Sequence, residues 1–573
     1  MESGTRLKRI MISGTFIISI MTFFLLITPA DLISMVIFMS IGLIVAFFFS
    51  SIGYFNRQLL KGKAALISSV LGVIFLCLNA GVFFETWEHS SLMKRILCKG
   101  NASFSLRLTV ISYLLSFVSM PFVIITISAF LRLIIKGYEN IEFKKIWNEQ
   151  KRIIQKKEFI NRLLIAIGTL SIACILGITL LRLVFLIPVR SIENNVKESA
   201  DTMKEEGYAF TISGFCTSQI DNWTDSLMLL ESADSNPGTT LERALYVYHG
   251  KIRDYNPQQV LTKHYCDNIA FDTKAIYPRY WHGYLVILKP LLVFFNYKMI
   301  RIINGILQLL FTIIVCKLLI DRKSIWHGIS YLISYLVLMP VSLAMCIQFS
   351  TCYYILTLGA LVILTMPRRM LISKISLVFF TIGIATAFFD FLTYPIATFG
   401  VPCAVYLSII KKETIEDKLS RIIRCGVMWI MGYGCMWSAK WIIASLILKK
   451  NIVADAFNNI ILRTSNTSMD GLTRLNSYHI LLKNYVSFFK TPVSVFAIIL
   501  ILYMLRYCIA NNNKRDYLIM IIPFLIVSIL PAIWYLFATN HSAVHYWFTN
   551  KACVVSLLSI LLGLADGVES GEI

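Results

Sequence analysis

The sequence predicts an all-α polytopic membrane protein. Of its 573 residues, 57% are hydrophobic and only 15% are charged, whereas a soluble domain carries roughly a quarter charged residues. Apolar runs of about 20 residues, the length that crosses a hydrocarbon core as a helix, recur along the chain. These runs are apolar on every face, which argues against a large soluble protein with buried helices.

Counting the apolar runs gives about 14 transmembrane helices. Each span is expected to be helical, because unpaired backbone amides are too costly in lipid. The expected spans are residues 10–28, 32–54, 64–84, 108–135, 163–187, 300–320, 325–345, 352–367, 375–390, 394–410, 424–446, 491–507, 517–537 and 552–567. The region 352–410 is crowded enough to contain a re-entrant segment.

Clusters of lysine and arginine predict the orientation. When the spans alternate, most clusters fall on one side, which the positive-inside rule assigns to the cytoplasm together with both termini. They comprise Arg57, Lys61, Lys63, Lys136, Lys144, Lys145, Lys151, Arg152, Lys156, Lys157, Arg162, Arg368, Arg369, Lys374, Lys411, Lys412, Lys418, Arg421, Arg506, Lys514 and Arg515. Lys94, Arg95 and Lys99 fall outside, in a loop expected to obey the rule weakly. The net charge of +22 is therefore mostly a topology signal that also attracts anionic membrane lipids, and no nucleic-acid partner is expected.

The spans divide the chain into three regions. Residues 1–135 are expected to form a four-helix membrane region, and residues 136–162 a basic cytoplasmic connector with an amphipathic helix on the inner surface. Residues 163–573 form the third region. Within it, residues 188–298 are a long polar loop on the outer side.

The long loop contains three recognisable segments. Residues 193–206 read as a charged helix, and residues 240–248 as a second helix after a turn. Residues 277–290 are rich in aromatic side chains but too short to span, so they are expected to lie in the headgroup zone that such rings prefer. Cys216 and Cys266 share this loop, and either a disulfide or two free thiols fits the sequence.

Acidic side chains at two places are the candidate catalytic groups. Asp221 and Asp225 lie in the long loop four residues apart, a spacing that puts both on one face of a helix. Asp390 ends an apolar run, where an acid is expected to face a cavity or a partner rather than lipid. The alternatives are ordinary solvated acids for the first pair and a structural ion pair with Lys440 for Asp390.

Basic and imidazole side chains are the candidate substrate-binding groups. Arg279 and His282 lie in the aromatic segment, and Lys440 lies between two tryptophans near the end of an apolar span. His541 and His545 are four residues apart before the last span, a spacing that suits a metal, although no third ligand is evident. Headgroup anchoring by long basic side chains is the structural alternative. Phosphate-binding loops and the usual hydrolase motifs are absent from the sequence.

One helix, a long outer loop, an interfacial segment and a further bundle follow one another in residues 163–573. This layout resembles the type C membrane glycosyltransferases, the GT-C fold, near the bacterial O-antigen-modifying glucosyltransferases. The matching segments are residues 221–225, 279–284, 389–395 and 540–545. The chain departs from the family in one respect. The family's acid often follows soon after the first helix, where Glu193, Glu198 and Asp201 lie, and this leaves the identity of the base open.

The resemblance implies a function. Such an enzyme transfers a sugar from a polyprenyl-phosphate donor to a cell-envelope glycan, at the extracytoplasmic face of a bacterial plasma membrane. Asp221 is then expected as base with Asp225 and Asp390 as supporting acids, and Arg279, His282 and Lys440 as donor-phosphate ligands. His541 and His545 would bind substrate. A divalent cation such as Mg²⁺ or Mn²⁺ and a metal-independent reaction remain equally open.

Other functions fit the same layout. A polysaccharide polymerase shares the many helices and the large outer loop, but is expected to use outer arginines rather than acids. A lipid-linked sugar flippase or other transporter is expected to show internal symmetry and broken helices near mid-membrane. No repeat is visible, although Pro340 and Pro395 offer helix breaks. A non-catalytic scaffold is disfavoured by an acid in apolar surroundings at Asp390.

Overall fold

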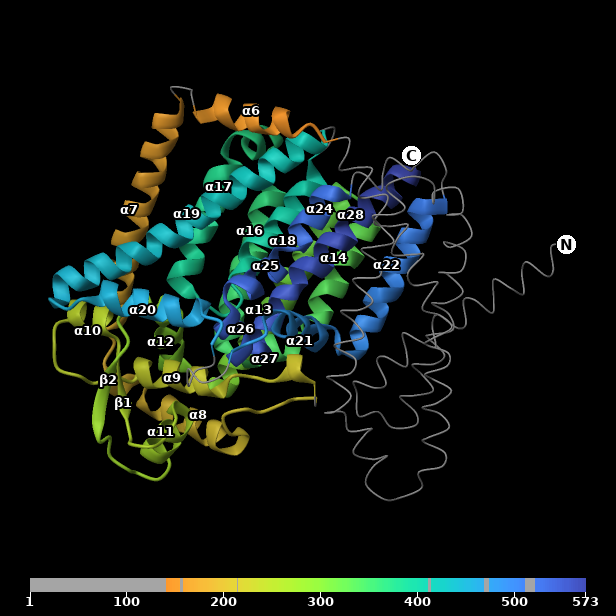
Figure 1. The fold of residues 1–573 in the computed structure, drawn as a ribbon. Coiled ribbons are helices and arrows are strands. Elements are labelled where there is room, and N and C mark those ends of the chain that lie inside the picture. The colour runs from red at the N-terminus through yellow and green to blue at the C-terminus, as the bar shows by residue number, and fades with distance from the viewer. Residues whose placement is uncertain are drawn as a thin grey trace, which may run out of the picture. The chain divides into compact units, whose positions relative to one another are not determined.

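The computed structural model describes residues 141–154, 158–213, 215–410, 414–467, 474–510 and 521–572, which are mostly helical (Figure 1). The four spans expected within residues 1–135 lie outside the described residues. The chain divides into two compact units, and the larger one comprises Phe143–Thr491 and Pro523–Leu562. The larger unit contains the long polar loop and the site discussed below.

Six helical segments of the described chain are long and apolar enough to cross a membrane. They are α7 (Glu158–Val184), α13 (Tyr297–Arg322), α16 (Ile347–Thr365), α17 (Arg368–Phe389), α19 (Ile415–Leu448) and the last span, which runs through α27 (Tyr546–Thr549), η5 (Asn550–Cys553) and α28 (Val554–Glu572). The class, an all-α membrane protein, is confirmed. The expected total of about 14 spans is not.

Shorter apolar helices occupy the other places where spans were expected. They are α14 (Ile325–Val337), α15 (Pro340–Met345), α18 (Ile396–Ile409), α24 (Ile522–Ser528) and α25 (Leu530–Phe537). The span expected at 491–507 is the 19-residue helix α22 (Pro492–Ala510) of the smaller unit. The apolar helix α12 (Leu285–Phe294) lies within the polar loop, where a segment too short to span was expected. The span expected at 325–345 is broken between α14 and α15. Met339 there has a φ of 59°, and Pro340 begins α15 because it needs no hydrogen-bond acceptor for an N–H.

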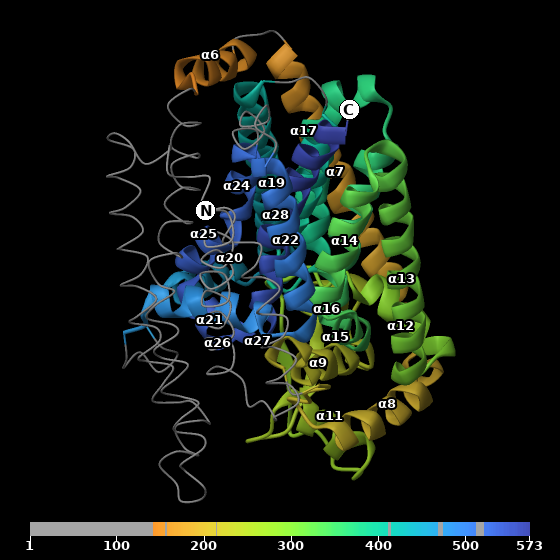
Figure 2. The same cartoon turned by 90° about the vertical axis from the view of Figure 1, so that its right-hand side faces the viewer.

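The long polar loop, residues 188–298, folds into short elements at one end of the bundle (Figures 1 and 2). They are η2 (Val189–Ser191), α8 (Glu193–Glu206), η3 (Cys216–Ser218), α9 (Asn222–Ser232), α10 (Thr240–Tyr246), β1 (Tyr248–Lys251), α11 (Pro257–Tyr265) and β2 (Thr273–Ile276). The helix expected at 193–206 is confirmed as α8. A capping box between Thr239 and Glu242 starts α10, so the helix expected at 240–248 is confirmed for its first seven residues.

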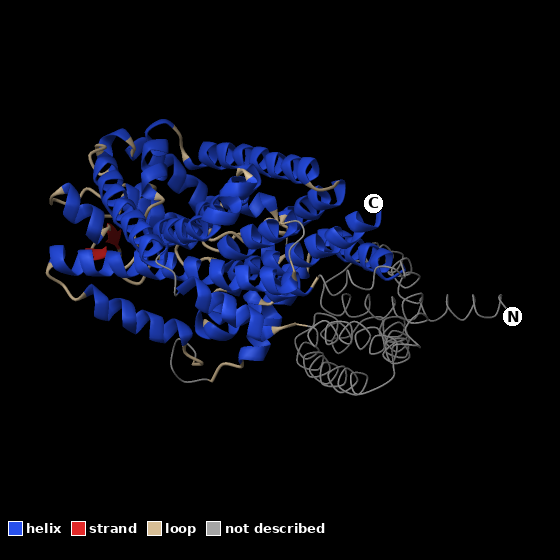
Figure 3. Ribbon diagram, turned by 90° about the horizontal axis from the view of Figure 1, so that it is seen from above, coloured by secondary structure: helices blue, strands red, loops and turns tan. Residues whose placement is uncertain are grey.

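The hairpin of β1 and β2 is antiparallel, with Tyr248 opposite Ile276. Figure 3 shows it as two short strands in an otherwise helical structure. Three further short helices lie at the same end of the bundle as the polar loop (Figure 1): α20 (Ile452–Thr464), α21 (Ser477–Phe489) and α26 (Thr539–Val544). Neither the hairpin nor these three helices were expected from the sequence.

The opposite end of the bundle carries the amphipathic helix α6 (Phe143–Ile154), which confirms the helix expected in the connector (Figure 1). Gln150 of α6 donates a hydrogen bond of 2.5 Å to the Ser420 hydroxyl of α19. Trp147 is 62% exposed, and Lys144 and Lys145 are exposed as well, so α6 presents an aromatic ring and these two lysines away from the bundle.

The polar loop is anchored in the bundle by its aromatic segment. The Trp281 side chain is 1% exposed, and its indole N–H donates to the Met436 carbonyl of α19 at 2.8 Å. The Gly283 N–H donates to the Phe388 carbonyl, and a Cβ at Gly283 would lie 2.5 Å from that oxygen. Trp281 therefore packs inside the protein, and its place relative to the headgroup zone stays a prediction. Because the Met436 carbonyl accepts the indole N–H of Trp281, the ring can be buried inside the protein without an unpaired polar group.

Helices α17 and α19 cross at very close range. A Cβ at Gly432 would lie 2.1 Å from the Phe380 carbonyl oxygen, and one at Gly383 would lie 2.3 Å from the Trp429 carbonyl oxygen. Small residues at helix crossings allow this approach, and in a membrane such packing supplies much of the association energy. The crossing fixes α19, whose next turns line a cavity described below.

A single methyl group at Gly432 is expected to separate α17 from α19. In Gly432→Ala the helices must move apart to clear the Phe380 carbonyl, and overpacking of this kind costs about 1–3 kcal/mol. The unfolding temperature of the purified protein in detergent should fall. Gly434→Ala is the matched control, because nothing lies within 4 Å of its Cβ position. Equal unfolding temperatures for the two variants would contradict the close crossing.

Candidate functional site

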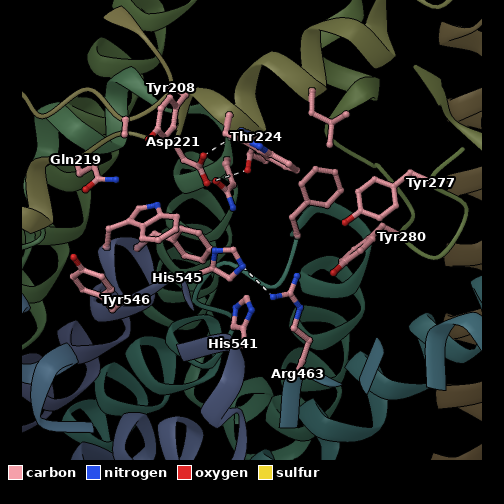
Figure 4. Close-up of a pocket in the computed structure, with 17 residues that line it drawn as sticks. Tyr208, Gln219, Asp221, Thr224, Tyr277, Tyr280, Arg463, His541, His545 and Tyr546 are labelled. Atoms are coloured by element: carbon pink, nitrogen blue, oxygen red, sulfur yellow. Dashed lines mark hydrogen bonds between the residues drawn. The ribbon is translucent and has the colours of Figure 1, made fainter. Parts of the chain in front are cut away.

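A polar cavity of about 450 Å³ lies between the polar loop and the bundle (Figure 4). Its walls come from the segments that follow α8 and η3, from α9, the aromatic segment, the start of α16, the turn after α17, α20, and α26 with α27. The lining residues are Tyr208, Ala209, Gln219, Asp221, Trp223, Thr224, Leu227, Tyr277, Tyr280, Gln348, Phe391, Arg463, His541, His545, Tyr546, Trp547 and Phe548. Six separate stretches of the chain thus meet around one chamber.

Asp221 is the acid on the wall of this cavity. It is the N-cap of α9, where its carboxylate accepts the Thr224 N–H at 3.1 Å and the Thr224 hydroxyl at 2.9 Å. The side chain is buried, and this loss of hydration raises its pKa to about 6, although the bonds from Thr224 oppose the shift. A carboxyl with such a pKa is ionised at neutral pH yet basic enough to accept a proton.

Asp225, the second expected acid, does not line the cavity. Its carboxylate accepts the N–H groups of Ile347 and Gln348 at 2.8 and 3.0 Å, together with the Tyr297 hydroxyl. Asp225 therefore caps the N-terminus of α16 from a helix more than 100 residues away in sequence, a favourable place for a negative charge. Burial raises its pKa against these hydrogen bonds.

Asp390 does not line the cavity either. It ends α17 and accepts the Thr393 N–H at 3.0 Å, and Leu392 between them has a φ of 65°. This turn carries Phe391 onto the cavity wall, so Asp390 positions that wall. The ion pair with Lys440, weighed as an alternative, does not form. Lys440 instead donates to the Leu245 carbonyl at 3.2 Å.

His541 and His545 both line the cavity, as expected for substrate-binding groups (Figure 4). His541 Nε2 lies 2.7 Å from the Leu392 carbonyl oxygen, and Arg463 donates to His545 Nε2 at 3.1 Å. Burial and the nearby Arg463 charge lower the pKa of His541 to about 3, while burial, His541 and Arg463 lower that of His545 to about 2. Both rings are therefore neutral at physiological pH.

The cavity's cation is Arg463, which the sequence analysis missed. Within the described part of the chain, no carboxylate lies within ion-pair distance of its guanidinium. Arg279, the expected phosphate ligand, is instead paired with Asp455 at 2.9 Å. Asp455, Asn459 and Arg463 follow at four-residue spacing on α20, so they share one helix face. That periodic polar face, beginning at the N-cap Asn451, was the signal available in the sequence.

His282 and Lys440, the other expected phosphate ligands, are buried outside the cavity. His282 bonds to the Tyr277 carbonyl and the Tyr284 hydroxyl at 2.7 and 2.9 Å, and lies 3.3 Å from the Glu231 carboxylate. Its ring supports Tyr277 and Tyr280, which form the aromatic wall. Neither His282 nor Lys440 lines this cavity.

A second cavity, of about 620 Å³, adjoins the first and is largely apolar. It lies between α19, α20, α25 and the start of α18. The lining residues are Arg279, Tyr280, Leu392, Ile396, Trp429, Ile430, Tyr433, Gly434, Trp437, Ser438, Trp441, Ala456, Asn459, Ile460, Arg463, Thr464, Leu530, Ile533, Trp534, Phe537 and Ala538. Tyr280 and Arg463 line both cavities, so the guanidinium marks the junction of a polar and an apolar space.

Two further expectations concern cysteines and metal. Cys216 and Cys266 are separate free thiols, and Cys266 lies 3.3 Å from the Asp201 carboxylate, so the disulfide alternative is wrong. Among the described residues that line the polar cavity, no three His, Cys, Asp or Glu side chains offer ligand atoms within 4.8 Å of one another. No metal ligands are assigned there.

Comparison of the chain with protein-family models, with curated proteins and with solved structures finds no match. The function is therefore inferred from the geometry and chemistry of the two cavities. Of the eight side chains expected at the site, Asp221, His541 and His545 line the polar cavity and Arg279 lines the apolar one. Asp225, His282, Asp390 and Lys440 lie behind the walls.

Removing the carboxylate of Asp225 is expected to destabilise the protein far more than removing that of Asp221. In Asp225→Ala, two N–H groups at the start of α16 lose their acceptor, and each unsatisfied buried group costs about 1–3 kcal/mol. The Tyr297 hydroxyl also loses its bond to the carboxylate and keeps only the Met345 carbonyl as acceptor. Asp221→Ala removes only bonds within the first turn of its own helix, from Thr224 and the Trp223 backbone. Thermal unfolding of both variants in detergent measures the difference. A less stable Asp221→Ala would overturn the structural role of Asp225.

Proposed function

We propose that this protein is a membrane glycosyltransferase. It transfers a sugar from a polyprenyl-phosphate donor to a cell-envelope glycan. The observation that carries the proposal is the junction of the two cavities at Arg463 and Tyr280. A lipid-phosphate sugar has its parts in the matching order: an apolar tail, an anionic phosphate and a polar sugar.

The apolar cavity suits the lipid tail. Its walls are aromatic and aliphatic side chains of membrane helices, among them Trp429, Tyr433 and Trp437 of α19 and Trp534 of α25. Ligand pockets that bind by burying apolar surface are lined in this way. A polyprenyl chain reaching this cavity from the membrane would stay in an apolar environment throughout.

The phosphate is assigned to Arg463. A guanidinium offers a planar fork of donors that matches phosphate oxygens, and Arg463 has no carboxylate competing for it within the described chain. Arg279 lies at the same apolar cavity and is paired with the partly exposed Asp455 at 2.9 Å. It serves as a second, weaker source of positive charge. Positive charge here stabilises the phosphate as it leaves.

The transfer follows from this placement. An acceptor hydroxyl oxygen forms a bond to the anomeric carbon while the bond from that carbon to the phosphate oxygen breaks. The hydroxyl proton passes to the Asp221 carboxylate, which faces the polar cavity. The electron pair of the broken bond stays on the phosphate, and the polyprenyl phosphate leaves as an anion beside Arg463. The charge that develops at the anomeric carbon is that of an oxocarbenium ion.

The orientation in the membrane is part of the proposal. The bundle end that carries α6 also carries the starts of α17 and α19, with Arg368, Arg369 and Lys418. Basic residues gather on the cytoplasmic side. We therefore place this end in the cytoplasm and the two cavities' polar end on the extracytoplasmic side of a bacterial plasma membrane.

Asp221→Asn is expected to lower the transfer rate by about 100- to 10,000-fold, the range for losing a general base. In the wild type, kcat/KM should fall as the pH drops through about 6, because protonation removes the base whose pKa lies there. Release of polyprenyl phosphate from a radiolabelled sugar donor in proteoliposomes measures both. Unchanged release in Asp221→Asn would reject the enzyme, and lost movement of the lipid-linked sugar across the membrane in that variant would indicate a transporter instead.

Filling the apolar cavity is expected to weaken donor binding without unfolding the protein. Gly434 lines this cavity and has nothing within 4 Å of its Cβ position, so Gly434→Leu places its side chain in the proposed tail site. The KM for the donor should rise about tenfold or more, which corresponds to about 1.4 kcal/mol. Gly168→Leu is the matched control, because Gly168 also has open space and lies on α7 away from both cavities. An equal KM in the two variants would contradict the tail site.

A further inference from the structure

The tautomers of the two cavity histidines are fixed by their neighbours. His541 Nε2 lies 2.7 Å from the Leu392 carbonyl oxygen, and because a carbonyl only accepts, this nitrogen carries the hydrogen. His545 Nε2 lies 3.1 Å from an Arg463 nitrogen, and because a guanidinium only donates, this nitrogen carries none. In neutral rings, His541 Nδ1 is therefore a bare acceptor and His545 Nδ1–H a donor.

Neither Nδ1 atom has a hydrogen-bond partner within the described chain, and both are buried. The two ring centroids are 4.9 Å apart, and both rings line the polar cavity. A buried polar atom without a partner costs about 1–3 kcal/mol. Two neighbouring rings of the cavity wall thus carry one unpartnered acceptor and one unpartnered donor, a pair that a ligand group of the right chemistry would complete.

We propose that the two Nδ1 atoms together bind one hydroxyl group of the transferred sugar, which donates to His541 and accepts from His545. This proposal rests on the proposed function and names the class of sugar. A hydroxyl both donates and accepts. A carboxylate cannot donate to His541, and an ammonium group cannot accept from His545. The group read by this pair is therefore uncharged.

The charges around the cavity agree with an uncharged sugar. Among its lining residues Asp221 is the acid and Arg463 the sole lysine or arginine, and the proposed phosphate occupies Arg463. A sugar carboxylate would lie in the same chamber as Asp221 without a further cation. The buried Gln348 also lines the chamber, and its side-chain oxygen has no partner among the described residues. It offers an acceptor for another sugar hydroxyl.

Two substitutions at His541 separate the roles of its nitrogens. His541→Gln retains an N–H at the level of Nε2, which holds the Leu392 carbonyl, but removes the Nδ1 acceptor. His541→Asn retains a polar group at the level of Nδ1 but loses the bond to Leu392. If Nδ1 binds the sugar, the sugar should no longer strengthen ligand binding in His541→Gln. If His541 is purely structural, His541→Asn should lose more sugar binding than His541→Gln, because it loses the bond to the Leu392 carbonyl.

The test compares thermal unfolding of the full-length protein in detergent with farnesyl phosphate alone and with farnesyl phosphate linked to glucose, galactose, mannose or glucuronate. The added stabilisation from the sugar is the measured quantity. At least one neutral sugar should add stabilisation in the wild type and glucuronate should add none. The increment should be lost in His541→Gln and partly kept in His541→Asn. An undiminished increment in His541→Gln, a larger increment from glucuronate, or no increment from any neutral sugar overturns the proposal.

Failure of this inference is distinguishable from failure of the proposed function. The unfolding increment needs no turnover, so it is also measured in Asp221→Asn. Release of farnesyl phosphate from the neutral donors reports the reaction separately. Release in the wild type with an undiminished increment in His541→Gln rejects the histidine pair alone. A sugar increment without release from any donor, in the presence of a glycan acceptor, rejects the transferase.

Discussion

Buried cations of the membrane helices, hydrogen-bonded to the polar loop, are the constraint on which the site depends. Lys440 of α19, Lys551 of η5 and Arg301 of α13 are each less than a tenth exposed. Their partners are the Leu245 carbonyl, the Thr217 carbonyl and the Glu206 carboxylate. A charge withdrawn from water is costly unless it is paired or hydrogen-bonded. The loop therefore cannot lift from the bundle without exposing or stranding three cations, and the chamber beneath it keeps its shape.

Most of the fold was accessible from the sequence because its signals are local. Hydrophobic runs placed helices at each span expected from residue 163 onward, and the charged stretch that became α8 was found with both ends correct. The lengths of the shorter helices and the break at Met339 were not predicted. Contacts with neighbouring helices decide where these helices end, and the composition of a segment carries no information about such contacts. The β1–β2 hairpin was missed because its pairing, Tyr248 with Ile276, joins residues on either side of α11.

The site was accessible only in part, because partners far apart in sequence decide which polar groups face the chamber. The same spacing argument applies to Asp221 and Asp225. The Asp225 carboxylate, however, is hydrogen-bonded by the backbone of α16 and by the Tyr297 hydroxyl, so it does not face the chamber. No local pattern reports this. Arg463 looked ordinary in the sequence, and its importance arises from α20 lying where two cavities meet. The histidine pair was found by spacing, but its hydrogen-bonding state depends on Leu392 and Arg463.

Because Arg463 lies where the two cavities meet, it couples binding in the apolar cavity to binding in the polar cavity. A guanidinium carries five N–H groups in one plane, and His545 engages one of them. On the proposed function, the same rigid plane contacts the phosphate on one side and orients the imidazole on the other. A ligand bound in either cavity then changes the affinity of the other cavity for its own ligand. Thermodynamic reciprocity makes that influence equal in both directions, so a lipid phosphate at Arg463 and an acceptor glycan in the polar cavity change each other's affinity by the same factor.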